Sequence, residues 1–245
     1  MSDKLTKKKL SIFFKILAHH RIGDLTACHA SILSNDKKSF FTNCHGHLFE
    51  EIRPKDLIKV KFNENRKKIF NKVNIAGYYI HRNIHLLKKV KIGAILHTHS
   101  ENGIAISCLK RGFITNLNQS SMRFHGAVKY IGHGGMAINQ EIGKLIAGLI
   151  DKNTRLIILR NHGVIILGET IEELHHLTFH FEKCASVQLK LMNKVKDLTL
   201  VNNNISKITA KQHKGFGPRG KLMWWPVGGM SWQASLRVLK KLRKI

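Results

Sequence analysis

Two apolar runs in this chain end in histidine, and they strongly limit how it can fold. The first run, Ile92-Gly93-Ala94-Ile95-Leu96, leads directly into His97-Thr98-His99. In an extended strand, residues i and i+2 project from the same face, so His97 and His99 can aim two imidazoles at one point. The second run, Leu156-Ile157-Ile158-Leu159, is followed by Arg160-Asn161-His162-Gly163. We therefore expect strands whose ends bring three histidines together.

These three histidines predict a metal site. Three neutral imidazoles with one position left open are a common way to hold a catalytic zinc ion. The alternative is a chance pairing, because the chain has 16 histidines and a single His-x-His is weak evidence. The same context, a strand end followed by histidine, occurs twice and favours the metal site at His97, His99 and His162.

The length of the chain bounds its architecture. A chain of 245 residues can form one large α/β domain with a well-buried core. No apolar run approaches the roughly 20 residues that a membrane span needs.

The first apolar segment does not fit a secretory signal, because Lys15 interrupts it where such a signal has an unbroken apolar core. Four scattered cysteines without a Cys-x-x-Cys pair indicate buried residues or free thiols in a reducing compartment. We therefore expect a cytoplasmic protein with no membrane partner.

The charge balance permits a different function. Forty-two Lys and Arg against 15 Asp and Glu give a net charge of +27, which would attract any polyanion. The basic residues are spread along the chain, and only 7% of residues are aromatic, with no basic run interleaved with aromatics. A compositional bias explains these features more simply than nucleic-acid binding, which stays a less favoured hypothesis.

Apolar periodicity and turn residues predict the order of elements. Strands are expected at 24–33, 39–42, 56–60, 92–97, 127–131 and 155–160, with 164–167 continuing the last one. Helices are expected at 10–20, 74–88, 102–109, 139–150, 170–193 and 233–244, and the chain from 197 to 232 is expected to be less regular. Ser100 is a predicted N-cap, and Thr170 with Glu173 fits a capping box. Three histidines on the helix at 170–193 (His175, His176 and His180) are interpreted as packing residues.

Several segments together resemble the class II aldolase/adducin family, and particularly its adducin-like bacterial branch. They are Asn74-Ile75-Ala76-Gly77-Tyr78-Tyr79-Ile80-His81, His97-Thr98-His99-Ser100, and Leu159-Arg160-Asn161-His162-Gly163-Val164 with Gly168-Glu169. His45-Gly46-His47-Leu48-Phe49-Glu50-Glu51-Ile52 and Arg123-Phe124-His125-Gly126 add to the match. The resemblance spans roughly residues 10–193 in the right order, which is far more specific than any single motif.

The resemblance implies a fold and a chemistry. It implies a three-layer α/β/α sandwich around a mostly antiparallel sheet in residues 1–200, with 201–245 as a basic tail that packs on or extends this domain. It also implies a homo-oligomer, with a tetramer favoured, and one zinc ion per chain on His97, His99 and His162. Zinc is a Lewis acid that polarises a substrate carbonyl and stabilises the enediolate formed when a C–C bond breaks.

Two departures from the family pattern affect this expectation. The aldolases carry a glutamate on the helix before the first histidine pair, whereas segment 76–79 here has no carboxylate. Glu101 is near in sequence, but it is expected at a helix N-terminus. At the family's phosphate pocket, His29 and Gly46 stand at the first two places and are candidate substrate-binding residues. Tyr79 and Tyr130 are candidates for assisting proton transfer, although packing is the simpler role for both.

The sequence therefore supports three hypotheses. The first is a zinc-dependent aldolase-type lyase that acts on a small hydroxy-carbonyl compound by retro-aldol or enolisation chemistry. The second is a non-catalytic, oligomeric binding module like adducin. The third is a basic nucleic-acid binder.

Overall fold

A seven-stranded sheet runs through the computed structural model, which describes residues 2–135, 139–215, 227–243 and 245. The strand order is β3-β2-β1-β4-β7-β6-β5. The strands are β1 His29–Leu33, β2 Ser39–Thr42, β3 Ile58–Lys61, β4 Ala94–Thr98, β5 Val128–Ile131, β6 Leu156–Leu159 and β7 Gly163–Gly168. Every neighbouring pair is antiparallel except β5 and β6, which are parallel. The predicted mostly antiparallel sheet is thereby confirmed.

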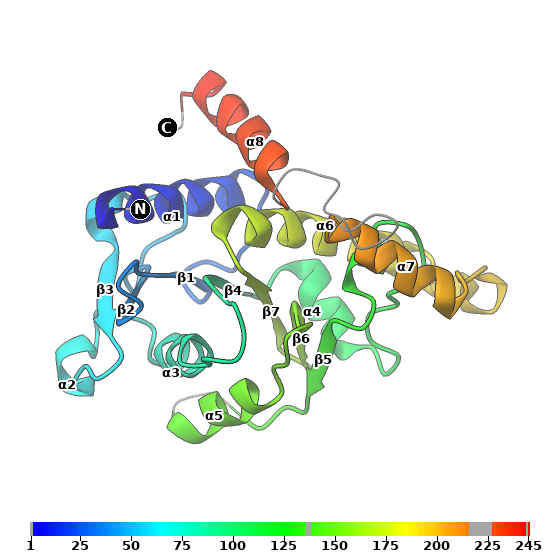
Figure 1. Ribbon diagram of the computed structural model, residues 1–245, viewed down its shortest axis with the longest axis horizontal. Helices are drawn as coiled ribbons and strands as arrows, with labels where there is room; N and C mark the ends of the chain where they lie inside the picture. The colour runs from blue at the N-terminus through cyan, green and yellow to red at the C-terminus, as the bar shows by residue number, and fades with distance from the viewer. Residues whose placement is uncertain (1, 136–138, 216–226, 244) are drawn as a thin grey trace.

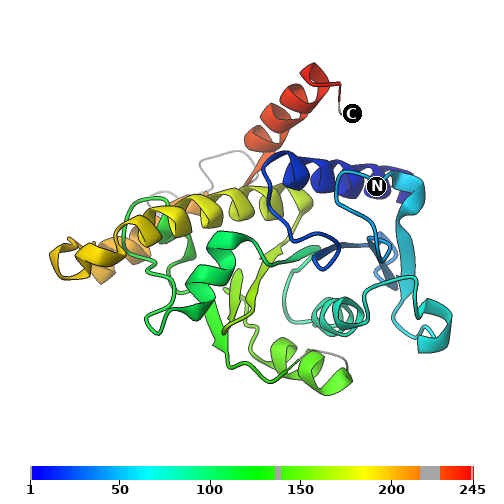
Figure 2. The same cartoon turned by 180° about the vertical axis from the view of Figure 1, so that it is seen from behind.

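Helices cover both faces of this sheet (Figure 1). The α-helices are α1 Asp3–His19, α2 Arg66–Ile69, α3 Ile75–His85, α4 Glu101–Cys108, α5 Gln140–Gly148, α6 Ile171–Lys190, α7 Asn203–His213 and α8 Gly229–Lys241. Short 3-10 helices are η1 Pro54–Asp56, η2 Ser121–Phe124 and η3 Met192–Asp197. Helices α1 and α6 lie on one face and α3 and α5 on the other, as both views show (Figures 1 and 2). The predicted three-layer α/β/α architecture is confirmed.

Alternation along the central strands divides the core into two layers. In β4, Leu96 packs in the cluster under α1 and α6, whereas Ile95 packs in the cluster with α3 and α5. The same alternation holds in β7, where Ile166 joins the first cluster and Ile165 the second. Successive side chains of a strand point to opposite faces, so both faces must be apolar when both are covered. His97 follows two residues after Ile95 and therefore faces the α3 side.

Polar caps start the helices where the sequence predicts them. The Ser100 hydroxyl accepts a hydrogen bond from the Gly103 N–H and begins α4. The Thr170 hydroxyl accepts from the Glu173 N–H and begins α6. The carboxylate of Glu173 accepts from the Glu169 N–H rather than from Thr170, so the predicted capping box is only half formed. These caps satisfy N–H groups that the helix itself leaves unpaired.

The structure corrects three expectations about element boundaries. The segment 164–167 does not continue β6; the chain reverses at Asn161 and His162, and β7 pairs with β6 in antiparallel fashion. The first strand begins only at His29, so Asp24 lies in the preceding loop. Within the predicted irregular region, residues 203–213 form α7, and α8 begins four residues before its predicted start. Residues 216–226 of the predicted tail, and residue 244 of its predicted helix, lie outside the described residues.

None of the helices in the described part of the chain has the length and apolar character needed to cross a bilayer.

Candidate metal centre

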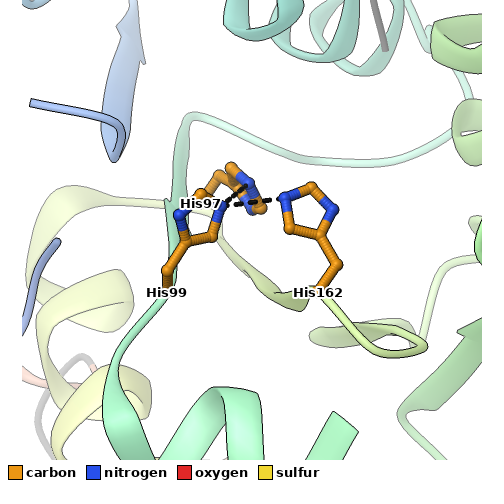
Figure 3. Close-up of side chains that lie close together, drawn as sticks. All are labelled: His97, His99 and His162. Atoms are coloured by element: carbon orange, nitrogen blue, oxygen red, sulfur yellow. Dashed lines mark hydrogen bonds between the residues drawn. The ribbon is translucent and has the colours of Figure 1, made fainter. Parts of the chain in front are cut away.

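Three histidine side chains meet at one point beside the end of β4 (Figure 3). His97 is the fourth residue of β4, and His99 follows the strand. His162 comes from the connection between β6 and β7. The His99 Nε2 atom lies 2.9 Å from the His97 Nε2 and 2.9 Å from the His162 Nε2. The structure thus brings together the three residues that the sequence selects as metal ligands.

The hydrogen-bond partners of Nδ1 in His97 and His99 show that Nε2 of each ring is unprotonated and carries a lone pair. The His97 Nδ1 donates to the Val164 carbonyl at 3.0 Å, and the His99 Nδ1 donates to an Asp24 carboxylate oxygen at 3.2 Å. Neutral imidazole carries one proton, so the Nε2 atoms of these rings present lone pairs to each other. Lone pairs this close repel unless a proton or cation lies between them. The donor set therefore fits a metal ion, and the acceptors at Nδ1 are the kind that orient metal-bound histidines.

A tight turn delivers the third histidine. Asn161 has φ +57, a left-handed conformation that asparagine tolerates better than most residues. The His162 N–H donates to the Ser107 hydroxyl, which ties the turn to the end of α4. A Cβ at Gly163 would lie 2.6 Å from the Thr98 carbonyl oxygen, so only glycine permits β7 to approach β4 this closely. The turn and the close approach together place His162 opposite the pair on β4.

Burial lowers the pKa values of two of the three histidines, His97 and His162. His97 is 2% exposed, and burial, followed by the nearby imidazoles, holds its pKa well below the usual value. Burial, followed by the charges of His99 and His133, lowers the pKa of His162 to about 4. Histidine binds a metal only in its neutral form, so this environment favours binding over protonation.

A cavity of about 370 Å³ opens beside the triad. Its walls come from the loop before β1, from the segment around α2 and from the first turns of α3. The described residues that line it are Ala27, His29, His45, Phe70, Asn71, Val73, Asn74, Ile75, Ala76, Ile80, His97, His99 and His162. No aspartate or glutamate is among these residues. The cavity therefore offers imidazoles and amides to a ligand over a largely apolar wall.

The predicted substrate-binding residues fall at or near this cavity. His29 lines it. Gly46 does not line it, but the adjacent His45 does, and Gly46 has φ +82 with open space where a side chain would project. A substrate contact of either residue stays a prediction.

The two candidate tyrosines lie away from the cavity walls. The Tyr130 hydroxyl accepts from the Phe113 N–H at 3.1 Å, and the Arg160 guanidinium stacks on its ring. Tyr79 packs beside the cluster that includes Phe40 and contacts Tyr78. Glu101 is the first residue of α4, as predicted, and is exposed. The proposed proton-transfer role of the tyrosines stays a prediction.

Sequence reasoning missed two features of the site. Asp24 orients His99 from 75 positions away, and no local pattern marks it. His81 and His85 on α3 form a buried hydrogen-bonded chain with His29 and Ser31. Their spacing of four on one helix, facing a strand with alternating polar residues His29 and Ser31, is a signal that could have indicated this chain.

Fold and site together define an α/β/α protein with a cluster of three histidines that could hold a metal ion, and the comparisons place it in a family. A family model described as the class II aldolase and adducin N-terminal domain matches residues 8–189. The chain belongs to the class II aldolase and adducin family.

Similar proteins include catalytic and adducin-related members. The structure of an aldolase II superfamily protein from Pseudomonas syringae is 27% identical with a TM-score of 0.84, covering 99% of this chain and 95% of that chain. An L-fuculose 1-phosphate aldolase from Glaciozyma antarctica is 26% identical with a TM-score of 0.78, covering 98% and 90% respectively. An adducin-related protein from Schizosaccharomyces pombe is 27% identical over 225 residues, 84% of this chain and 68% of that protein.

Proposed function

We propose that this protein is a zinc-dependent, aldolase-type lyase that acts on a small hydroxy-carbonyl compound. The observation that carries the proposal is the convergence of three Nε2 lone pairs, two of them fixed by acceptors at Nδ1. The triad lines a cavity large enough for a small molecule. The similarity to an L-fuculose 1-phosphate aldolase supports the same reaction class.

The roles of the chain's residues follow from their positions. His97, His99 and His162 would hold one zinc ion, which supplies Lewis acidity toward a substrate carbonyl. Asp24 and the Val164 carbonyl hold two of the rings in the tautomer that leaves Nε2 free. The apolar wall formed by residues such as Phe70 and Val73 limits water around a bound substrate. A homo-oligomer, with a tetramer favoured, belongs to this proposal.

A metal measurement tests the proposal. Purified protein should contain about one zinc ion per chain, and His97→Ala should lose it while circular dichroism shows the fold retained. A screen of hydroxy-carbonyl compounds for aldehyde release, with chelator-treated protein as control, then tests the reaction. Folded wild-type protein that binds no divalent metal would overturn the proposal.

The adducin-related relative favours a second candidate, a non-catalytic oligomeric binding module. On this alternative the protein forms the same oligomer, but no hydroxy-carbonyl compound is cleaved and His97→Ala leaves its assembly unchanged. Size-exclusion chromatography of wild type and His97→Ala, measured beside the aldehyde screen, separates the two candidates.

A further inference from the structure

The segment around Arg123, which adds to the family resemblance, does not line the cavity beside the triad. Arg123 belongs to the 3-10 helix η2, and its side chain contacts α6. The Arg123 Nε donates to the Ser120 carbonyl at 3.0 Å, and Nη1 donates to the His176 Nε2 at 2.7 Å. A guanidinium has five N–H groups, so these two bonds leave donors that no described residue accepts.

Arg123 is a partly buried cation without an acidic partner. Burial lowers the pKa of its guanidinium to about 10, so the group is still charged at neutral pH. The arginine ion pairs among the described residues involve Arg53 and Arg155 and not Arg123. The residues outside the described ranges include no aspartate or glutamate. Because taking a cation out of water is costly, such a charge is normally paired. A counter-ion for Arg123 must therefore come from outside the chain.

Imidazoles from two helices surround this guanidinium. His176 and His180 are one turn apart on α6, and their ring centroids are 4.4 Å apart. His213, at the end of α7, donates from Nε2 to the Gln119 carbonyl at 2.7 Å, next to η2. Burial comes first and the Arg123 charge second among the causes that lower the pKa values of these three rings. Arg123, His176, His180 and His213 thus form a cluster, here called the Arg123 cluster, that contains no carboxylate.

Two members of the Arg123 cluster have nitrogens without a protein partner. The His180 Nδ1 is buried and makes no hydrogen bond within the described part of the chain, although buried polar atoms are nearly always bonded. No contact therefore fixes the proton of this ring on one nitrogen. Arg123, His180 and His213 are all partly exposed, so a small ligand can reach them from solvent.

We propose that the Arg123 cluster binds a phosphate group, either as inorganic phosphate or as the monoester of a small molecule. The remaining N–H groups of the guanidinium form a fork that matches two phosphate oxygens. Ser120 and His176 hold the guanidinium in position, and His180 and His213 flank it. Phosphate carries about −1.5 to −2 charges at pH 7, so it favours protonated imidazoles beside it more than a carboxylate does. The proposal is independent of the lyase function.

Calorimetric titration with inorganic phosphate tests the site. In about 0.15 M salt, which screens diffuse attraction, wild type should bind one phosphate per chain. Arg123→Gln should weaken this binding by about 10–100-fold, the worth of hydrogen bonds to a charged group. Arg111→Gln removes an exposed arginine instead and should change the affinity by less than about twofold. His97→Ala should bind phosphate as wild type does, which separates this site from the metal centre.

Arg123→Lys keeps the charge and tests the fork without removing the cation. It should weaken phosphate binding by at least about threefold, because an ammonium cannot bind two oxygens in the bidentate way. Nitrogen-15 NMR of histidine-labelled wild type needs no substitution in the site. Phosphate should shift the ring signals of His180 and His213 and leave those of His45, an exposed histidine, unchanged.

The two sources of phosphate separate in the same titration. Tighter binding of glycerol 1-phosphate than of inorganic phosphate supports a phosphorylated small molecule, and the reverse order supports free phosphate. Equal losses in Arg123→Gln and Arg111→Gln would overturn the proposal, because they would show only diffuse attraction to the net charge of +27. Acetate that binds as tightly as phosphate, or ring signals of His180 that do not move, would overturn it as well.

Discussion

Two groups of histidines lie on opposite faces of the sheet, and they differ in what their ring nitrogens contact. In the triad, Asp24 and the Val164 carbonyl accept from Nδ1 and leave Nε2 free. On α6, Arg123 Nη1 donates to the His176 Nε2 at 2.7 Å, and the His176 Nδ1 donates to the Ser231 hydroxyl. Arginine has no lone pair to offer, so this bond consumes the lone pair that a metal would need. Neighbouring donors and acceptors, rather than the number of histidines, decide which cluster can bind a cation.

Removing one histidine from each group should produce the largest difference in zinc affinity between the two groups. We expect His162→Ala to weaken zinc affinity by more than about 100-fold, beyond the range for outer partners of metal ligands. His176→Ala should change zinc affinity by less than about twofold, because its lone pair is already occupied. Competition with a chromophoric chelator measures both, and equal losses in the two variants would contradict the distinction.

Removing the carboxylate of Asp24, which accepts from the His99 Nδ1, should have the next largest effect on zinc affinity. Asp24→Ala removes the carboxylate that holds the His99 proton on Nδ1, and should weaken zinc affinity by about 10–100-fold. Because Asp24 is about half exposed, its loss should change the free energy of unfolding of the metal-free protein by less than about 0.5 kcal/mol. An unchanged zinc affinity would show that His99 needs no carboxylate partner.

Lowering the pH should destabilise the fold at the α6 histidines, because the folded protein holds the His176 ring in its neutral form. Burial, followed by the Arg123 charge, lowers the pKa of His176 to about 4, whereas the unfolded chain takes up this proton below about 6.5. The contribution of the neutral His176 ring to the free energy of unfolding is therefore present above about pH 6.5, and it is lost as the pH falls toward 4. We expect His176 to account for about 1–2 kcal/mol of this loss, allowing for its partial exposure.

Urea denaturation of chelator-treated protein at pH 7 and pH 5 measures this loss. His176→Gln should flatten the dependence of the free energy of unfolding on pH, whereas His45→Gln, at an exposed position, should keep the wild-type slope. Identical slopes for all three proteins would mean that the His176 ring protonates in the folded state as readily as in the unfolded chain.

The smallest expected effect comes from the hydroxyl on α8. Ser231→Ala removes the acceptor for His176 Nδ1–H and should lower the free energy of unfolding by about 0.5–1.5 kcal/mol, the usual net worth of one hydrogen bond. Zinc affinity should stay unchanged, in contrast to Asp24→Ala. A change in zinc affinity on this substitution would show that the two faces of the sheet are energetically coupled.

The convergence of the three histidines could be predicted from the sequence because each follows a recognisable strand. Period-two spacing put His97 and His99 on one face, and an apolar run marked the approach to His162. The same rules failed where the tertiary structure decides. The reversal at Asn161 has no proline or diglycine signal, so β7 was predicted as a continuation of β6. Helix α7 is mostly polar, with Ile205 and Ile208 exposed, and therefore lacks a clear apolar face.

The contacts that tune the site could not be predicted, since they join distant segments. Asp24 meets His99 only after β1 and β4 have paired, and Arg123 meets His176 across 53 positions. A single sequence carries no record of such pairings. The burial of His97 and His176 also depends on contacts between distant segments. Their lowered pKa values arise only once helices and strands have assembled around them.

The separation of the ligands along the chain has a consequence for folding kinetics. His99 and His162 are 63 positions apart, and they meet only once β4 and β7 have registered against each other. On the proposed function, a partly synthesised or collapsed chain offers zinc only the His97 and His99 pair, and we expect a far lower affinity there. Full-affinity capture of the ion during refolding should therefore lag behind secondary structure and report the moment when the long-range pairing is complete.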